Sequence, residues 1–286
     1  MHVFHDARCA EYGRAGHPDR PERILRTVPL LKEKHQGWKW THPEATTRDQ
    51  LLLVHSPEYI DEVCFSRADF DSDCPAYPHI YDHAARAAGS AISAARNAGK
   101  GEASFSLMRP PGHHALRGRA MGFCYFSNIA LAGLDALRRG VERVAIWDFD
   151  AHHGNGTEAL VAHHERIAFA SIHQYPGWPG TGTRSFANIH NYPIAPYSPR
   201  AHHMAAAERS LEVLLSVEPQ LLLVSAGFDA FANDPITQMT LEIEDFASFG
   251  TWLRQLDVPV AAILEGGYSD ELPELVNAFL SEWDNC

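Results

Sequence analysis

The chain has 286 residues, of which 45% are hydrophobic and 21% charged, and its 24 basic and 36 acidic side chains give a formal charge of −12. These proportions are typical of a globular protein, no apolar run approaches the roughly 20 residues of a membrane helix, and the negative charge argues against a general binder of nucleic acid or anionic membranes. The five cysteines include no C-x-x-C pair and the first residues lack the blocks of a signal peptide, so we expect a reduced, cytoplasmic chain.

Apolar runs alternate with helical segments after a less regular stretch of about 75 residues. That stretch contains expected helices at 21–34 and 57–65. Further along the chain we expect strands at 103–108, 143–149, 166–172, 220–225 and 258–264, and helices at 81–97, 128–139, 201–217, 241–256 and 271–283. No repeat or linker divides the sequence. We therefore expect a single α/β domain over 1–286, with a mainly parallel sheet flanked by helices.

Polar residues follow each of the five expected strands. They are RPPGHH (109–114), DFDAHHG (148–154), SIH (171–173), AGFD (226–229) and EGGY (265–268). In open parallel sheets the ligand crevice lies outside the carboxyl ends of the strands. One carboxylate there could be a helix cap or a turn residue, but five such strand ends together favour an active site at this edge.

Asp150 and His152 are spaced so that both side chains can bind one ion, and Asp229 can supply a third ligand from another strand end. Three protein ligands leave an open coordination position, as catalytic zinc sites require. The alternative is that Asp150 caps the following helix and that His152 is a surface residue. Asp148 extends the alternating pattern Asp148, Asp150, His152, although it could orient a neighbouring ligand instead of binding the ion itself.

His113 and His114 follow a Pro-Pro-Gly turn that directs both toward the same edge. A metal-dependent hydrolase needs a base, an acid and a donor to the oxyanion. Adjacent histidines can supply the first two if different partners separate their pKa values, and Tyr268, on a Gly-Gly turn, can supply the third. The alternatives are a solvated histidine pair and a half-buried core tyrosine. Serine-hydrolase, P-loop and H-E-x-x-H motifs are absent from the sequence.

Eight motifs, in this order, resemble the histone deacetylase superfamily, including its acetylpolyamine and acetoin-utilisation-type members. They are HPDRPER (17–23), DCP (73–75), RPPGHH (109–114), GFCYF (122–126), DFDAHHG (148–154), PGTG (179–182), AGFD (226–229) and EGGY (265–268). The resemblance implies the arginase/deacetylase fold and zinc-dependent hydrolysis of linear amides. Asn155 stands where one branch has aspartate, which is typical of the class II pattern.

The resemblance also implies roles for individual residues. It assigns one zinc ion to Asp150, His152 and Asp229, and a monovalent cation, usually potassium, to Asp148 and Ser171. The implied catalytic residues are the general base His114, its charge-tuning neighbour His113, and Tyr268, which hydrogen-bonds the substrate carbonyl. The implied substrate-binding residues are Asp73, Gly122, Phe123, Trp178, Gly266 and Gly267, with Phe123 and Trp178 as the walls of an acyl-lysine tunnel. Arg20, or its rival Arg23, matches an arginine near the product channel.

Two other functions fit the sequence less well. Arginases share the fold and use two metals, but Gly154 and Phe231 stand where they carry the additional carboxylates. A protein that only binds acyl-lysine would be expected to have lost Tyr268 or His114. The substrate itself stays open among acyl-lysine in a protein or peptide, an acetylpolyamine and another small amide. Ile236 follows an Asp-Pro step where polyamine-selective relatives can carry an acidic gatekeeper, which modestly favours acyl-lysine.

Overall fold

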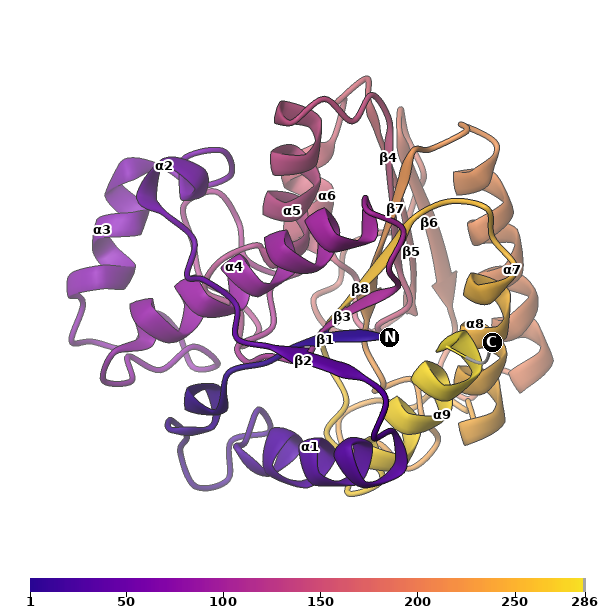
Figure 1. Ribbon diagram of the computed structural model, residues 1–286, viewed down its shortest axis with the longest axis horizontal. Helices are drawn as coiled ribbons and strands as arrows, with labels where there is room; N and C mark the ends of the chain where they lie inside the picture. The colour runs from indigo at the N-terminus through magenta and orange to yellow at the C-terminus, as the bar shows by residue number, and fades with distance from the viewer. Residues whose placement is uncertain (285–286) are drawn as a thin grey trace.

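The computed structural model describes residues 1–284, and an eight-stranded, entirely parallel sheet forms its centre (Figure 1). Its strands are β1 (His2–Phe4), β2 (Lys39–Thr41), β3 (Ser104–Ser106), β4 (Val144–Asp148), β5 (Ile167–Gln174), β6 (Ile189–Ile194), β7 (Leu221–Ala226) and β8 (Val260–Leu264). Their order across the sheet is β2-β1-β3-β8-β7-β4-β5-β6. The predicted α/β architecture is thereby confirmed.

Helices cover both faces of the sheet. Their bounds are η1 (Ala7–Ala10), α1 (Glu22–Lys34), α2 (Arg48–Leu51), α3 (Pro57–Phe65), α4 (Ile80–Ala98), α5 (Asn128–Arg138), α6 (Asn155–Val161), α7 (Arg200–Leu215), α8 (Ile243–Arg254) and α9 (Leu272–Asp284). Figure 1 shows α4, α5 and α6 on one side of the sheet and α7, α8 and α9 on the other. Central strands are therefore buried on both faces, which explains why they appear in the sequence as continuous apolar runs.

Strand β4 illustrates how the two cores are built. All of its residues are buried, and successive side chains point to opposite faces of the sheet. Val144 and Ile146 pack in the core under α4 and α5, whereas Ala145 and Trp147 pack in the core under α7, α8 and α9. Asp148 ends the strand, so the chain reaches the carboxyl edge of the sheet directly from a rigid, buried element.

All five expected strands and all seven expected helices are present; the helix expected at 57–65 coincides with α3, and the others have ends shifted by a few residues. The expected strand 103–108 contracts to Ser104–Ser106. Strands β1, β2 and β6 and helices α2 and α6 were not expected. Edge strands β2 and β6 have exposed or partly exposed residues, so they lack the apolar run that marks the central strands.

The four central strands β3, β8, β7 and β4 lie side by side, and their carboxyl ends lead into the candidate motifs. Cys9, Cys64, Cys74 and Cys124 are free thiols, and Cys286 lies outside the described residues. Among residues 1–284, none of the helices combines the length and apolar character needed to cross a membrane.

Candidate active site

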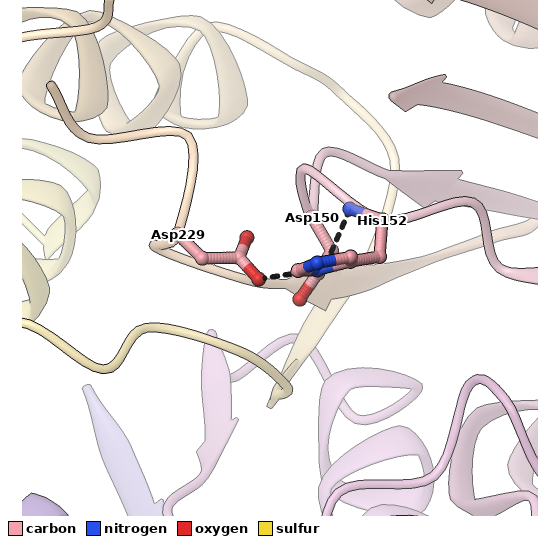
Figure 2. A group of neighbouring side chains, drawn as sticks. All are labelled: Asp150, His152 and Asp229. Carbon is pink, nitrogen blue, oxygen red and sulfur yellow. Dashed lines mark hydrogen bonds and ion pairs between the residues drawn. The ribbon is translucent and has the colours of Figure 1, made fainter. Parts of the chain in front are cut away.

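Asp150, His152 and Asp229 meet at the carboxyl edge of the sheet (Figure 2). One ligand atom from each lies within 4.8 Å of the other two. His152 Nδ1 is 2.8 Å from Asp229 Oδ2 and 3.3 Å from Asp150 Oδ1. Both carboxylates are fully buried. Two buried carboxylates that share one imidazole form a donor set with an excess of negative charge, which fits a divalent cation.

The alternative roles of Asp150 and His152 do not match the structure. The N-cap of α6 is Gly154, so Asp150 does not cap that helix. The side chain of His152 is only 13% exposed, so it is not a surface residue. Although burial opposes it, the Asp229 and Asp150 carboxylates raise the pKa of His152 to about 10. A cation that binds here must displace that proton, and its affinity should therefore weaken as the pH falls.

Glycines let the backbone approach the two carboxylates closely. Gly266 donates its N–H to Asp150 Oδ2 at 2.7 Å, and Ala151 donates to Asp229 Oδ1 at 2.7 Å. A Cβ atom on Gly266 would lie 2.4 Å from Asp229 Oδ2 and 2.5 Å from Asp150 Oδ2. The adjacent Gly267 has a φ of +112°, a conformation that favours glycine. The Gly-Gly turn thus helps to hold the carboxylates of the candidate metal site.

We expect Gly266→Ala to weaken metal binding by about 10- to 100-fold, the usual cost of disturbing groups that orient metal ligands. The new methyl group would overlap with both carboxylates and displace them. Titration of the metal-depleted protein with zinc would measure the effect. Gly37→Ala is the matched control, because a Cβ atom there meets nothing within 4 Å. Unchanged affinity in Gly266→Ala would contradict the close packing described here.

His113 and His114 are buried, but they have different partners. His113 Nδ1 donates to Asp148 Oδ2 at 3.0 Å, whereas His114 Nδ1 lies 2.7 Å from Asn155 Oδ1. Although burial opposes it, the Asp148 carboxylate raises the pKa of His113 well above its usual value. Burial, reinforced by the positive charge of His113, lowers the pKa of His114 well below its usual value. His114 is therefore held neutral beside a charged His113, so one nitrogen of its ring keeps a lone pair, although the positive neighbour makes the ring a weaker base.

Tyr268 is 7% exposed and borders the same cavity as His114. Its backbone N–H donates to Asp234 Oδ2 at 2.8 Å, which anchors the end of the Gly-Gly turn. Burial raises the pKa of the Tyr268 hydroxyl well above its usual value. The hydroxyl therefore keeps its proton and can donate it in a hydrogen bond.

Of the two rival arginines, Arg23 lies beside Tyr268. Its guanidinium carbon is 4.8 Å from the centre of the Tyr268 ring, and its Nε donates to the Gly267 carbonyl at 2.8 Å. Arg20 is partly exposed instead and pairs with Asp270. Both arginines lie in the HPDRPER motif, so the sequence did not show which of them reaches the site. In the structure Arg23 is on the buried side of α1.

Behind the Gly-Gly turn lies a buried ion-pair cluster that the sequence motifs did not reveal. Asp19 Oδ1 accepts hydrogen bonds from Arg23 Nη1 and Arg109 Nε, both at 2.7 Å. All three side chains are buried. The cluster joins the HPDRPER motif to the RPPGHH motif. In the sequence, the signal for it was limited to the charged residues that these two motifs contain.

A cavity of about 230 Å³ lies over the candidate metal site and contains most of the expected substrate-binding residues. It is lined by Pro18, Asp73, His114, Gly122, Phe123, His152, Trp178, Ile236 and Tyr268. Trp178 contacts His114 edge-on at 4.6 Å between ring centres, and Phe123 contacts Tyr268 in the same way at 5.6 Å. Gly266 and Gly267 lie behind the carboxylates and are not among the lining residues.

Two further histidines hold the loop that carries Trp178. His153 Nδ1 lies 2.8 Å from the Thr181 hydroxyl, and His173 Nε2 donates to the Gly182 carbonyl at 3.0 Å. A Cβ atom on Gly182 would lie 2.5 Å from both rings. These positioning contacts were not predicted, although the abundance of histidine in the sequence was a signal for them.

The structure also brings together the residues expected to bind a monovalent cation. Asp148 and Ser171 are direct neighbours across β4 and β5, and both are buried. Each already has another partner, because Asp148 accepts from His113 and the Ser171 hydroxyl lies 2.9 Å from His173 Nδ1. A cation bound to Asp148 and Ser171 would therefore share these side chains with His113 and His173.

Comparison with known proteins shows similarity over nearly the whole chain. Residues 17–282 match the family described as "Histone deacetylase domain". A histone deacetylase-like amidohydrolase from Pseudomonas aeruginosa is 38% identical over 283 residues, which cover 90% of this chain and 73% of that protein. A probable deacetylase from Archaeoglobus fulgidus is 33% identical over 293 residues, which cover 94% and 81% of the two chains. The solved structure of an acetylpolyamine aminohydrolase from Burkholderia pseudomallei aligns with a TM-score of 0.90 at 25% identity, covering 99% of this chain and 98% of that one.

Proposed function

The chain belongs to the histone deacetylase superfamily, and from that premise we propose that it is a zinc-dependent hydrolase that removes acetyl or other acyl groups from lysine-like amines. One observation carries the proposal: His152, which is grouped with Asp150 and Asp229, lines the same cavity as His114 and Tyr268. The names of the relatives, which include amidohydrolases and probable deacetylases, support the same reaction class.

The chemistry that we propose divides the work among these residues. Zinc held by Asp150, His152 and Asp229 would polarise the amide carbonyl and lower the pKa of water. His114 accepts a proton from the attacking water, and Tyr268 donates a hydrogen bond to the carbonyl oxygen as negative charge develops on it. His114 then returns the proton to the departing amine. The products are an acid, most simply acetate, and a free amine.

The preferred substrate in this proposal is acyl-lysine in a protein or peptide. Phe123 and Trp178 border the cavity and would contact the alkyl part of a lysine side chain, and Asp73 would accept hydrogen bonds from the peptide backbone. Acetylpolyamines are the alternative, because relatives of this chain carry that name. Ile236, an apolar residue in the cavity wall, favours the first substrate since it offers no charge to a distant ammonium group.

We expect Ile236→Glu to shift the preference toward acetylpolyamines. The ratio of kcat/KM for an acetylpolyamine to that for an acetyl-lysine peptide should rise about two- to fivefold, because a partly screened ion pair contributes up to about 1 kcal/mol. Ile236→Gln is the control that adds polarity without charge. An equal shift in both variants would mean that the carboxylate does not bind the ammonium group, and would count against this basis for substrate choice.

A panel of acyl-lysine peptides and acetylpolyamines, assayed with the zinc-loaded protein, tests the proposed function as a whole. We expect hydrolysis with a higher kcat/KM for acyl-lysine peptides. Binding of these peptides without any cleavage would indicate a protein that only binds acyl-lysine. Cleavage of acetylpolyamines alone would favour the alternative substrate.

We further propose that a potassium ion binds at Asp148 and Ser171, which are buried neighbours across two strands. Exchange of potassium for a bulky organic cation should lower Tm by about 2–4 °C, as a loss of about 1 kcal/mol does for a chain of this size class. Activity should fall with it, because Asp148 also holds His113. Ser171→Ala should reduce the dependence on potassium. A Tm that does not respond to potassium would refute this site.

A further inference from the structure

Glu265 is a fully buried carboxylate to which none of the steps above gives a role. It directly follows β8, next to the end of β3 in the sheet. Its Oε2 accepts hydrogen bonds from the backbone N–H of Gly112 at 2.7 Å and of His113 at 3.1 Å. Its Oε1 accepts a hydrogen bond from the Ser225 hydroxyl at 3.3 Å. One side chain thus connects the ends of β7 and β8 to the loop that follows β3.

The backbone of His113 is held from both sides. Its N–H is bound by Glu265, and its carbonyl accepts the N–H groups of Gly156 and Thr157 at 3.0 Å each, at the start of α6. Gly112 is tightly packed as well, because a Cβ atom there would lie 2.5 Å from the backbone nitrogen of Asn128. The loop has little freedom, and Glu265 supplies the only side-chain acceptor among these contacts.

A carboxylate at this buried position needs compensating contacts, because burial of a charge costs several kcal/mol unless charged or strongly hydrogen-bonded partners offset it. An apolar residue would pack in the same space without that cost. It would, however, leave the backbone N–H groups of Gly112 and His113 buried without an acceptor, and an unsatisfied buried donor costs about 1–3 kcal/mol. The presence of Glu265 is therefore best explained by the two N–H groups that it orients.

We propose that Glu265 is a positioning residue for the His113–His114 pair. By holding the N–H groups of Gly112 and His113, it sets the loop so that the His114 ring points into the cavity, while Asn155 holds the other side of that ring. This inference rests on the proposed hydrolysis, in which His114 takes the proton from water. Its effect would appear in kcat, because the Glu265 side chain hydrogen-bonds Gly112, His113 and Ser225 and none of the metal ligands.

Glu265→Ala and Glu265→Gln form the test. Alanine removes the acceptor, so kcat should fall about 10- to 100-fold, as a misplacement of about 1 Å can do, while KM and the bound zinc per chain stay unchanged. Glutamine can place its carbonyl oxygen where Oε2 lies and donate its amide to the Ser225 hydroxyl, so it should restore kcat to within about threefold of the parent. Ser225→Ala, which removes only the Oε1 partner, should resemble the parent.

A purely structural role would lower thermal stability in Glu265→Ala without lowering kcat per folded molecule, and this result would overturn the proposal. Loss of kcat in Glu265→Gln equal to that in Glu265→Ala would also overturn it, because charge rather than hydrogen bonding would then be the cause. If Glu265→Ala does not fold, Glu265→Gln and Glu265→Asp replace it, since aspartate is too short to reach both N–H groups and should lose the activity that glutamine keeps.

NMR separates this inference from the proposed function. The His113 amide and His114 ring signals should shift in Glu265→Ala and stay close to the parent in Glu265→Gln, whether or not the parent protein hydrolyses an amide. Signals that do not move in Glu265→Ala would reject the positioning role alone. A parent protein without amidase activity would reject the proposed function alone.

Discussion

Asp229→Ala should remove both the bound metal and the hydrolase activity. The purified parent protein is expected to hold about one zinc-like ion per chain, and loss of one of three protein ligands should leave a site too weak to retain it. Asp229 is fully buried and contributes its Oδ2 oxygen to the group within 4.8 Å of His152 and Asp150. Elemental analysis after gel filtration, together with an acetyl-lysine assay, would measure both effects.

Asp257→Ala is the control for this experiment, because it removes an exposed aspartate on the same chain. Hydroxamates should inhibit the parent protein by binding the metal at its open coordination position.

Two tightly bound manganese ions per chain would refute the single-metal site and support an arginase-like reaction. Iron or cobalt at the same ligands would change the identity of the metal but not the expected number of ions.

The sequence predicted the central part of the fold better than its edges. Strands β4, β7 and β8 are buried on both faces, so their apolar runs are visible without any knowledge of the fold. Strands β1 and β2 have three residues each, and their strand geometry comes from pairing with β3 and with each other. Periodicity cannot indicate elements of that length, because long-range pairing rather than local sequence stabilises them.

The same distinction applies to the candidate site. Asp150 and His152 are close in sequence, and Asp229 follows another apolar run, so a parallel sheet was enough to predict that the three would meet. The partners that separate the pKa values of His113 and His114 were harder to predict from the sequence. The contact between His114 and Asn155 spans 41 residues, and the one between Glu265 and the Gly112 N–H spans 153. Such contacts depend on the exact placement of loops, which motif spacing does not encode.

Tyr268→Phe is expected to lower kcat by ~10²–10³, or about 3–4 kcal/mol of transition-state stabilisation, if the hydroxyl donates to the oxyanion. The substitution removes one oxygen atom and keeps the ring. The ring contacts with Phe123 and Arg23 do not require the hydroxyl, so the cavity should keep its shape and the zinc its ligands. KM should change far less than kcat, because the hydrogen bond strengthens mainly as charge develops on the carbonyl oxygen.

The pH dependence adds a second criterion. Burial raises the pKa of the Tyr268 hydroxyl well above its usual value, so this group should stay protonated across the neutral range and cause no loss of activity there. Any loss on the acidic side should therefore come from other groups and persist unchanged in Tyr268→Phe. His114→Ala should also disable turnover while zinc stays bound, since His114 is proposed as a base and not as a ligand. Nearly full kcat for Tyr268→Phe on a good acetyl-lysine substrate would show that its hydroxyl does not stabilise the transition state.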